Sequence, residues 1–206
     1  ISVALFILLP YFVAGLLRRF TGSETVIALA EACVRMLLFL AYLVLISRMK
    51  DIQRVFMYHG AEHKCINCVE HGMNLTVENV MKSSREHKRC GTSFLLFVMI
   101  VSILFFLFIR VPIPWLRVVI RILLLPVIAG VSYEIIRLAG NSDNPVVSLL
   151  SKPGLALQRL TTREPEEDMV EVAIRAVEAV FDWREYLREN FPGTQVLPEE
   201  EKEAVQ

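Results

Sequence analysis

The 206-residue chain lacks two features that would assign it quickly. Its four cysteines are too few for a disulfide framework in a chain of this length. Its 22 Lys and Arg residues balance 22 Asp and Glu residues, so the absence of net charge argues against a nucleic-acid partner. Apolar residues are abundant instead, at 54% of the chain, with a mean hydropathy of +0.49. This excess is more than a soluble domain buries, and it predicts a membrane protein.

The apolar residues form four long runs, which predict an all-α integral membrane bundle of about four transmembrane helices with cytoplasmic helical segments. A spanning helix needs roughly 17–25 apolar residues, and the runs cover residues 1–17, 26–46, 94–109 and 115–138. Gly140 is expected to cap the last run. The resulting regions are 1–47 and 93–139 in the membrane, 48–92 between them, amphipathic helices over 140–192, and an acidic disordered tail over 193–206.

The basic residues predict the orientation of the chain. Eight Lys and Arg residues lie between the second and third runs, whereas the two opposite connections contain Arg18, Arg19 and Arg110. Because positive loops stay in the cytoplasm, residues 48–92 and the C-terminus are expected on the cytoplasmic face of the cytoplasmic (inner) membrane. The cysteines there remain thiols in that compartment. The chain begins at Ile1 without an initiating Met, so we expect a fragment or a processed form.

Two of the runs contain ionisable residues. Glu31 and Arg35 lie four positions apart with the acid first, so they can pair on one helix face. Arg121 and Glu134 lie in the last run. Charges at membrane depth are costly unless they are paired or face a protein-lined interior. The sequence predicts buried pairing, with a Glu31 near the aqueous interface as the alternative.

All four histidines and three of the cysteines fall between positions 59 and 90. We expect one helix from Arg48 to about His71, continuing from the second span and interrupted at most by Gly60. Thr76 is a good N-cap for a second helix, from Val77 to about Arg85.

His59, Glu62 and His63 form an H-x-x-E-H pattern. On a helix both rings can reach one metal ion, and Glu62 flanks them as a potential general base. The third ligand must come from elsewhere, and His87 or Cys90 is the better candidate. Glu70 is roughly 10 Å farther along the helix axis than His63. The alternative is that both histidines line a polar face or bind lipid phosphate.

A second grouping competes with the first. Cys65 and Cys68, followed by His87 and Cys90, have the spacing of a structural zinc knuckle. The two thiols point some 120–180° away from the histidine stripe at about 100° per residue, so one metal cannot easily use both groups. His71, at the helix end, is expected to be a cap residue.

The C-terminal region is amphipathic. The spacing predicts an interfacial helix over residues 145–160 and a second helix starting at Glu164 and Pro165. The apolar stripe of the second helix runs from Met169 to Trp183 and needs a partner surface, either the central segment or another protein.

Several stretches resemble the YqhQ family of bacterial polytopic membrane proteins, from about the second span to Ala179. They are YHGAEHK, INCVE, LTVENV, SREHKRCGTSF, LLLPVIAGVSYEIIRLAG and PGLALQRLTTREP. The resemblance implies a predicted metal-dependent enzyme without an assigned activity. The family pattern matches His59, Glu62, His63, Lys64, Glu70, Glu78, Asn79, His87, Arg89, Cys90, Gly91, Ser93, Glu31, Arg35, Arg121 and Glu134.

The chain departs from that family in two places. Cys65 stands where the family usually has Thr or Val, which disfavours the four-ligand knuckle. The family's N-terminal GGQAV.EGVMM region is absent, so any residue that it contributes to a site is missing.

The favoured hypothesis is a hydrolase acting on a membrane-proximal amide or ester. His59 and His63 would bind zinc or another divalent metal with His87 or Cys90, and Glu62 would be the general base. Arg89 or Lys64 would stabilise a developing anion.

Two other hypotheses stay open. One is a scaffold or assembly factor with a structural metal clasp, whose C-terminal helix binds a protein partner. The other is a transporter subunit with a Glu31, Arg35, Arg121 and Glu134 track, which four spans would support only in a homo-oligomer. The expected partners are therefore the lipid bilayer and, in these two cases, protein.

Overall fold

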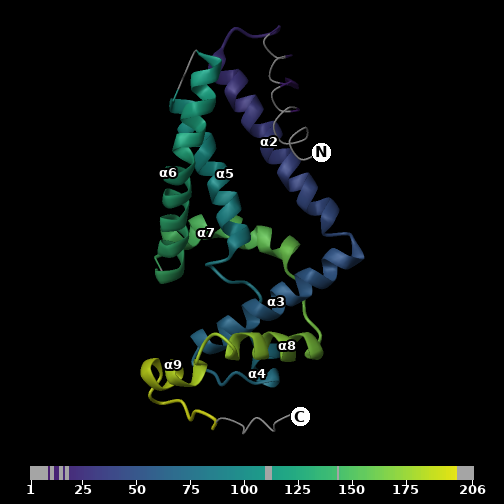
Figure 1. Cartoon of the computed structure of the whole chain (residues 1–206), viewed down its shortest axis with the longest axis vertical. Helices are drawn as coiled ribbons and strands as arrows, with labels where there is room; N and C mark the ends of the chain where they lie inside the picture. The colour runs from purple at the N-terminus through teal and green to yellow at the C-terminus, as the bar shows by residue number, and fades with distance from the viewer. Residues whose placement is uncertain are drawn as a thin grey trace. The chain divides into compact units, whose positions relative to one another are not determined.

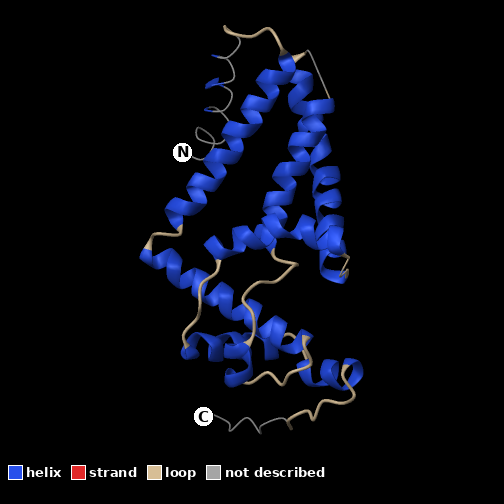
Figure 2. Cartoon of the chain, turned by 180° about the vertical axis from the view of Figure 1, so that it is seen from behind, coloured by secondary structure: helices blue, strands red, loops and turns tan. Residues whose placement is uncertain are grey.

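The computed structural model describes residues 9, 12–13, 16, 19–109, 113–142 and 144–198, and within them the regular structure is entirely helical (Figure 2). The expected first span falls almost wholly outside the described residues, as does the end of the acidic tail. The chain divides into two compact units. The apolar unit comprises Ile1–Met49 and Lys88–Thr161, and the polar unit comprises Lys50–His87 and Thr162–Gln206.

The apolar unit contains α2 (Glu24–Ile46), α5 (Gly91–Phe108), α6 (Pro114–Asn141) and α7 (Pro145–Thr161). Three stretches are long and apolar enough to cross a membrane: α2 with 23 residues, α5 with 18, and Val119–Asn141 of α6 with 23. Three of the four expected spans are thus confirmed by length and composition. Within this unit α7 packs against α5 and α6 and runs across their ends (Figure 1).

The contact between α7 and α5 depends on one glycine and one buried hydrogen bond. A Cβ atom on Gly154 would lie 2.9 Å from both Cβ and Oγ of Ser93, so only glycine allows this approach. Gln158 Nε2 then donates to Ser93 Oγ at 2.8 Å, and both side chains are buried. The pairing satisfies two polar groups that would otherwise be costly inside the unit.

The expected cap at Gly140 is wrong, because α6 continues through it to Asn141. This glycine is instead a site of close approach. A Cβ atom there would lie 2.6 Å from Cγ and Cδ of Arg89. Pro126 also lies inside α6 without ending it.

The polar unit contains α3 (Lys50–Glu70), α4 (Val77–Lys82), α8 (Glu167–Glu178) and α9 (Trp183–Asn190). Helix α8 packs against α3 and α4, so the C-terminal apolar stripe has a partner surface inside the chain. The buried core of this unit is formed by Ala61, Cys65, Cys68, Val69, Leu75, Val80, Val170, Trp183 and Leu187.

One sequence expectation for the first half of this unit needs correction. Helix α3 does not continue from α2, because α2 ends at Ile46 and a turn precedes Lys50. Gly60 does not interrupt α3. The carbonyl oxygen of Arg163 lies against it where a side chain would be, and the Arg163 N–H donates to the Phe56 carbonyl at 2.9 Å. Thr76 caps α4 as expected, accepting from the Asn79 N–H at 3.3 Å.

The C-terminal stripe also differs from the expected single helix. Helix α8 begins at Glu167, two residues after Pro165, and ends at Glu178. Asp182 then starts α9 by accepting from the backbone N–H groups of Arg184 and Glu185 at 3.0 and 2.9 Å. The local N-cap of Asp182 therefore overrides the continuous apolar periodicity.

Candidate metal centre

Two imidazole rings lie on successive turns of α3. The ring centroids of His59 and His63 are 4.4 Å apart and the rings are nearly edge-on, at 68°. This is the arrangement that a spacing of four residues produces on a helix. The expected adjacency of the two rings is present.

A hydrogen bond determines which nitrogen of His63 can bind a metal. Its Nδ1 atom lies 2.7 Å from the carbonyl oxygen of Arg85. A carbonyl only accepts, so Nδ1 bears the proton and the neutral ring keeps its lone pair on Nε2. Metal-binding histidines are commonly oriented in this way.

The segment that supplies this carbonyl is tied to α3 by buried polar contacts. Asn67 Nδ2 donates to the carbonyls of Ser84 and Glu86 at 2.6 and 3.0 Å. Lys64 Nζ donates to the carbonyls of Met81 and Ser83, both at 2.9 Å. These contacts position His63 and the residues that lead to His87.

The contacts of Lys64 bear on its expected role. Its third interaction is an ion pair with Glu164 Oε2 at 3.0 Å, and Arg85 Nε lies 3.5 Å from the other carboxylate oxygen. An ammonium group has three N–H donors, and each of those on Lys64 has a protein oxygen. No donor remains for a developing anion, so the contacts of Lys64 are structural.

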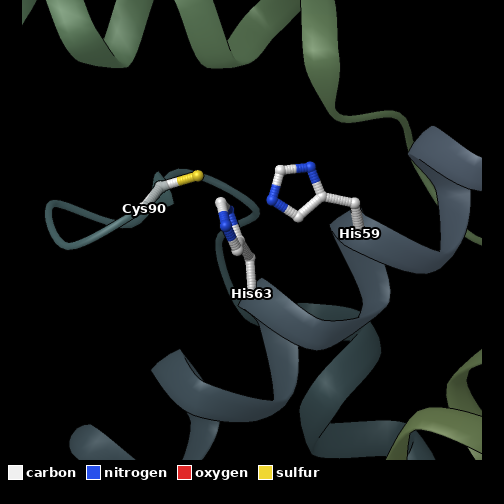
Figure 3. A group of neighbouring side chains, drawn as sticks. All are labelled: His59, His63 and Cys90. Atoms are coloured by element: carbon white, nitrogen blue, oxygen red, sulfur yellow. The ribbon is translucent and has the colours of Figure 1, made fainter. Parts of the chain in front are cut away.

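Cys90 completes a group of three potential ligands. The residue follows His87 by three positions, so the chain itself keeps their Cα atoms within about 11 Å. The ligand atoms of His59, His63 and Cys90 all lie within 4.8 Å of one another, and across the described residues the group has these three members (Figure 3). Imidazole nitrogen and thiolate sulfur are the ligands that zinc prefers.

His87, the other expected ligand, has a different partner. Its Nε2 atom lies 3.1 Å from Glu70 Oε2, and its ring centroid lies 5.8 Å from that of His63. Sequence reasoning placed Glu70 beyond the reach of the metal but did not foresee this pair. No spacing rule joins the two residues, because the return of the chain after α4 brings them together.

The cysteine knuckle is not supported by the environment of its first two members. Cys65 and Cys68 are fully buried in the apolar core of the polar unit. Burial is the main cause that raises the pKa of Cys65 to about 12, with smaller contributions from Cys68 and Glu62. Burial also raises the pKa of Cys68 to about 11, partly offset by its hydrogen bond with Ser83. Without a bound metal both are neutral thiols, and a metal would have to displace their protons to bind them.

The other residues of the segment 48–92 that the sequence singled out lie on the surface or at helix ends. Glu62 is exposed on α3. Glu78 pairs with Lys82 at 2.6 Å, and that hydrogen bond lowers its pKa. Asn79 donates to the Asn74 carbonyl at 2.9 Å, beside the start of α4. His71 Nδ1 donates to the Asn67 carbonyl at 2.7 Å, as expected of a residue at the helix end.

The expected pairing inside the spans is present in the apolar unit. Arg35 Nη2 lies 2.8 Å from Glu31 Oε1. Arg121 approaches the same oxygen at 3.8 Å and lies 4.9 Å over the ring of Phe106. Two cations thus share one carboxylate, and Arg35 Nε is buried without a hydrogen-bond partner within the described part of the chain.

Glu134 does not join this cluster. It pairs with Arg137 at 3.0 Å, and both side chains are more than half exposed. Since 13 residues of α6 separate it from Arg121, the two lie about 20 Å apart along the axis. The expected four-residue track is therefore reduced to three residues.

Three helices that are long and apolar enough to cross a membrane indicate a helical membrane protein, and the histidine–cysteine group is a candidate metal site. The chain belongs to the family described as "Protein of unknown function (DUF1385)", which matches residues 1–183. It is 44% identical over 176 residues to the "Uncharacterized protein YqhQ" of Bacillus subtilis (strain 168). That match covers 85% of this chain and 55% of the relative, so the chain spans about half the length of its relative. The family resemblance of the sequence is confirmed. No solved structure matches the chain.

Proposed function

We propose that the protein is a metal-dependent hydrolase of the cytoplasmic membrane, with His59, His63 and Cys90 as ligands of zinc or another divalent metal. The observation that carries the proposal is the convergence of these three ligand atoms within 4.8 Å. The His63 Nδ1 contact supports it, since it leaves Nε2 for the metal. Bound zinc would supply a Lewis acid that polarises a carbonyl and lowers the pKa of water.

The number of ligands favours catalysis over a structural clasp. Structural zinc sites have four protein ligands, whereas catalytic sites have three and an open position. The group has three members among the described residues, and Cys65 and Cys68, the other thiols that could supply a fourth ligand, are buried in the core. An open position is what a hydrolytic site needs.

Two residues of the chain would then supply the general base and the stabilisation of the developing anion. Glu62 is exposed, one residue before His63, and as general base it would take a proton from the attacking water. Arg89, adjacent to Cys90, would stabilise the developing anion. The substrate class is an amide or ester held close to the membrane surface.

Metal analysis of the full chain, purified in detergent, tests the ligand set. Wild type should hold about one zinc per chain. Both a His59→Ala, His63→Ala variant and Cys90→Ala should lose it. Cys68→Ala and His71→Ala are the matched controls and should retain it. Retention in Cys90→Ala, or equal loss in Cys68→Ala, would contradict the assignment.

The role of Glu62 has its own test. Glu62→Gln should keep the metal and abolish hydrolysis of amide and ester probes in a detergent–lipid mixture. If the variant instead loses the metal, Glu62 is a ligand or a structural residue and not the base.

A scaffold with a structural clasp is the second candidate, supported by the position of the His87 ring 5.8 Å from that of His63. X-ray absorption spectroscopy separates the two functions, since a clasp shows four protein ligands and a catalytic site shows three with one light-atom ligand.

A transporter subunit is the third candidate, and the cluster of Glu31, Arg35 and Arg121 supports it. Glu31→Gln should then alter flux in vesicles, and unchanged flux would remove the idea.

A further inference from the structure

The apolar unit contains a cavity at the start of α5 and the end of α6. Its volume is about 480 Å³, within the range of small-molecule sites. Arg89, Cys90 and Gly91 line it from the α5 side, and Tyr133, Arg137 and Asn141 line it from α6. The proposed chemistry uses Cys90 and Arg89 but gives no role to the α6 side of this cavity.

The charges of the lining residues indicate the charge of the ligand that the cavity would bind. Among the described residues, the lining contains two guanidinium groups and no carboxylate. The phenol of Tyr133 and the amide of Asn141 add neutral donors on the same wall. Guanidinium groups bind phosphate through parallel N–H bonds, which gives both energy and geometry. The donors of this cavity therefore favour a phosphate group.

The position of Arg89 is built into the fold. A Cβ atom on Gly140 would lie 2.6 Å from Cγ and Cδ of Arg89, so the side chain passes over a helix position without a side chain. Glycine at position 140 thus allows the arginine stem to lie against α6. This packing holds one of the two cationic groups at the cavity wall.

The surroundings indicate how such a ligand is presented. The cavity lies where α5 begins and Val119–Asn141 ends, both of which are candidate spans. Helix ends of this kind lie at the headgroup level of a bilayer. Phe94 and Ile136 add an apolar part to the lining. A phosphate attached to an apolar tail matches both parts.

We infer that this cavity binds a phosphate group, presented either by an anionic phospholipid or by a free phosphate, through Arg89 and Arg137. The cavity shares Arg89 and Cys90 with the proposed hydrolase, but phosphate binding through Arg89 and Arg137 needs no metal, so the two proposals can fail separately.

The ion pair between Arg137 and Glu134 allows a test in which two substitutions should change phosphate binding in opposite directions. Its guanidinium lies 3.0 Å from Glu134, which competes with any ligand anion. Arg137→Gln should weaken binding about tenfold, the usual effect of removing a charged hydrogen-bond donor. Glu134→Gln should strengthen binding about two- to fivefold, because it removes a competing exposed partner.

Titration of the full chain in detergent with short-chain phosphatidylglycerol, short-chain phosphatidylcholine and inorganic phosphate provides the measurement, with bound species counted by native mass spectrometry. Lys152→Gln on α7 is the matched control, since it removes one exposed cation that does not line the cavity. Gly140→Ala is a second variant, which should weaken binding by displacing Arg89 without any change of charge. Metal content should be unchanged in Arg137→Gln, which separates this site from the metal centre.

Comparison of the three ligands shows whether the bound phosphate belongs to a lipid or is free in solution. Binding of phosphatidylglycerol that free phosphate does not displace assigns the site to a lipid, and displacement by phosphate assigns it to the phosphate group alone. Equal binding in Arg137→Gln and Lys152→Gln would overturn the inference. Equal binding of the two phospholipids by wild type, without binding of inorganic phosphate, would also overturn it.

Discussion

Lys64 Nζ lies 3.0 Å from Oε2 of Glu164, and these two residues join the two distant parts of the sequence that make the polar unit. The lysine is 4% exposed, and it also donates to the carbonyls of Met81 and Ser83. One buried ammonium group therefore holds α3, the residues that end α4, and the start of the C-terminal region in one arrangement. The His63 Nδ1 contact with the Arg85 carbonyl depends on this arrangement.

Lys64→Met should destabilise the protein by about 2 kcal/mol, because buried carbonyl groups lose their donor. Thermal unfolding in detergent, followed by circular dichroism, measures the change. Lys82→Met is the matched control, since Lys82 pairs with Glu78 on the surface and the loss of this exposed pair should leave the Tm unchanged. Equal Tm values for the two variants would contradict a structural role for Lys64.

Gly60→Ala should destabilise the polar unit by about 1–3 kcal/mol, because the added methyl group overlaps the Arg163 carbonyl oxygen and backbone must move. Gly130→Ala is the control, a helical glycine whose added Cβ would meet no atom within 4 Å among the described residues outside its own turn of helix. The Tm of each variant is compared with that of wild type. A Gly60→Ala protein as stable as Gly130→Ala would show that the 162–165 segment does not lie against α3.

The raised pKa of Cys68 predicts a stability that falls in alkaline solution. Its thiol stays protonated in the folded state up to about pH 11, whereas in the unfolded chain it ionises near pH ~8.5. Between these values only the unfolded state gains from losing the proton, so stability is lost as pH rises, by up to about 1.4 kcal/mol per pH unit.

Comparison of wild type with Cys68→Ala isolates this effect from other titrating groups. The stability advantage of wild type should be constant below pH 8 and shrink from pH 9 to 11. In parallel, alkylation of Cys68 at pH 8, read by mass spectrometry, should require unfolding. Rapid alkylation of the folded protein would refute the burial of this thiol.

Glu31→Gln should destabilise the apolar unit by about 3 kcal/mol, because it leaves Arg35 and Arg121 without their shared carboxylate. Glu134→Gln removes an exposed pair and should change stability little. Thermal stability in detergent, followed by size-exclusion chromatography, compares the two. A Glu31→Gln protein as stable as Glu134→Gln would mean that the cluster is solvated rather than buried.

The features that follow from local chemistry were predictable from the sequence. Apolar runs of spanning length predict α2, α5 and most of α6, because in lipid a helix satisfies its backbone polar groups with its own hydrogen bonds. The spacing of His59 and His63 places both rings on one face, since helix geometry alone sets that relation. The hydroxyl of Thr76 marks the start of α4 for the same local reason.

Other features depend on residues that are distant in sequence, and only the tertiary structure decided them. The pairs Lys64–Glu164 and Glu70–His87 form because later parts of the chain return to α3. Gly140 was expected to cap its helix, but Gly140 and Gly60 each provide space for a group from another segment. Periodicity and capping act within a few residues. These contacts instead arise from the packing of distant segments, which cannot be predicted from the sequence of either segment alone.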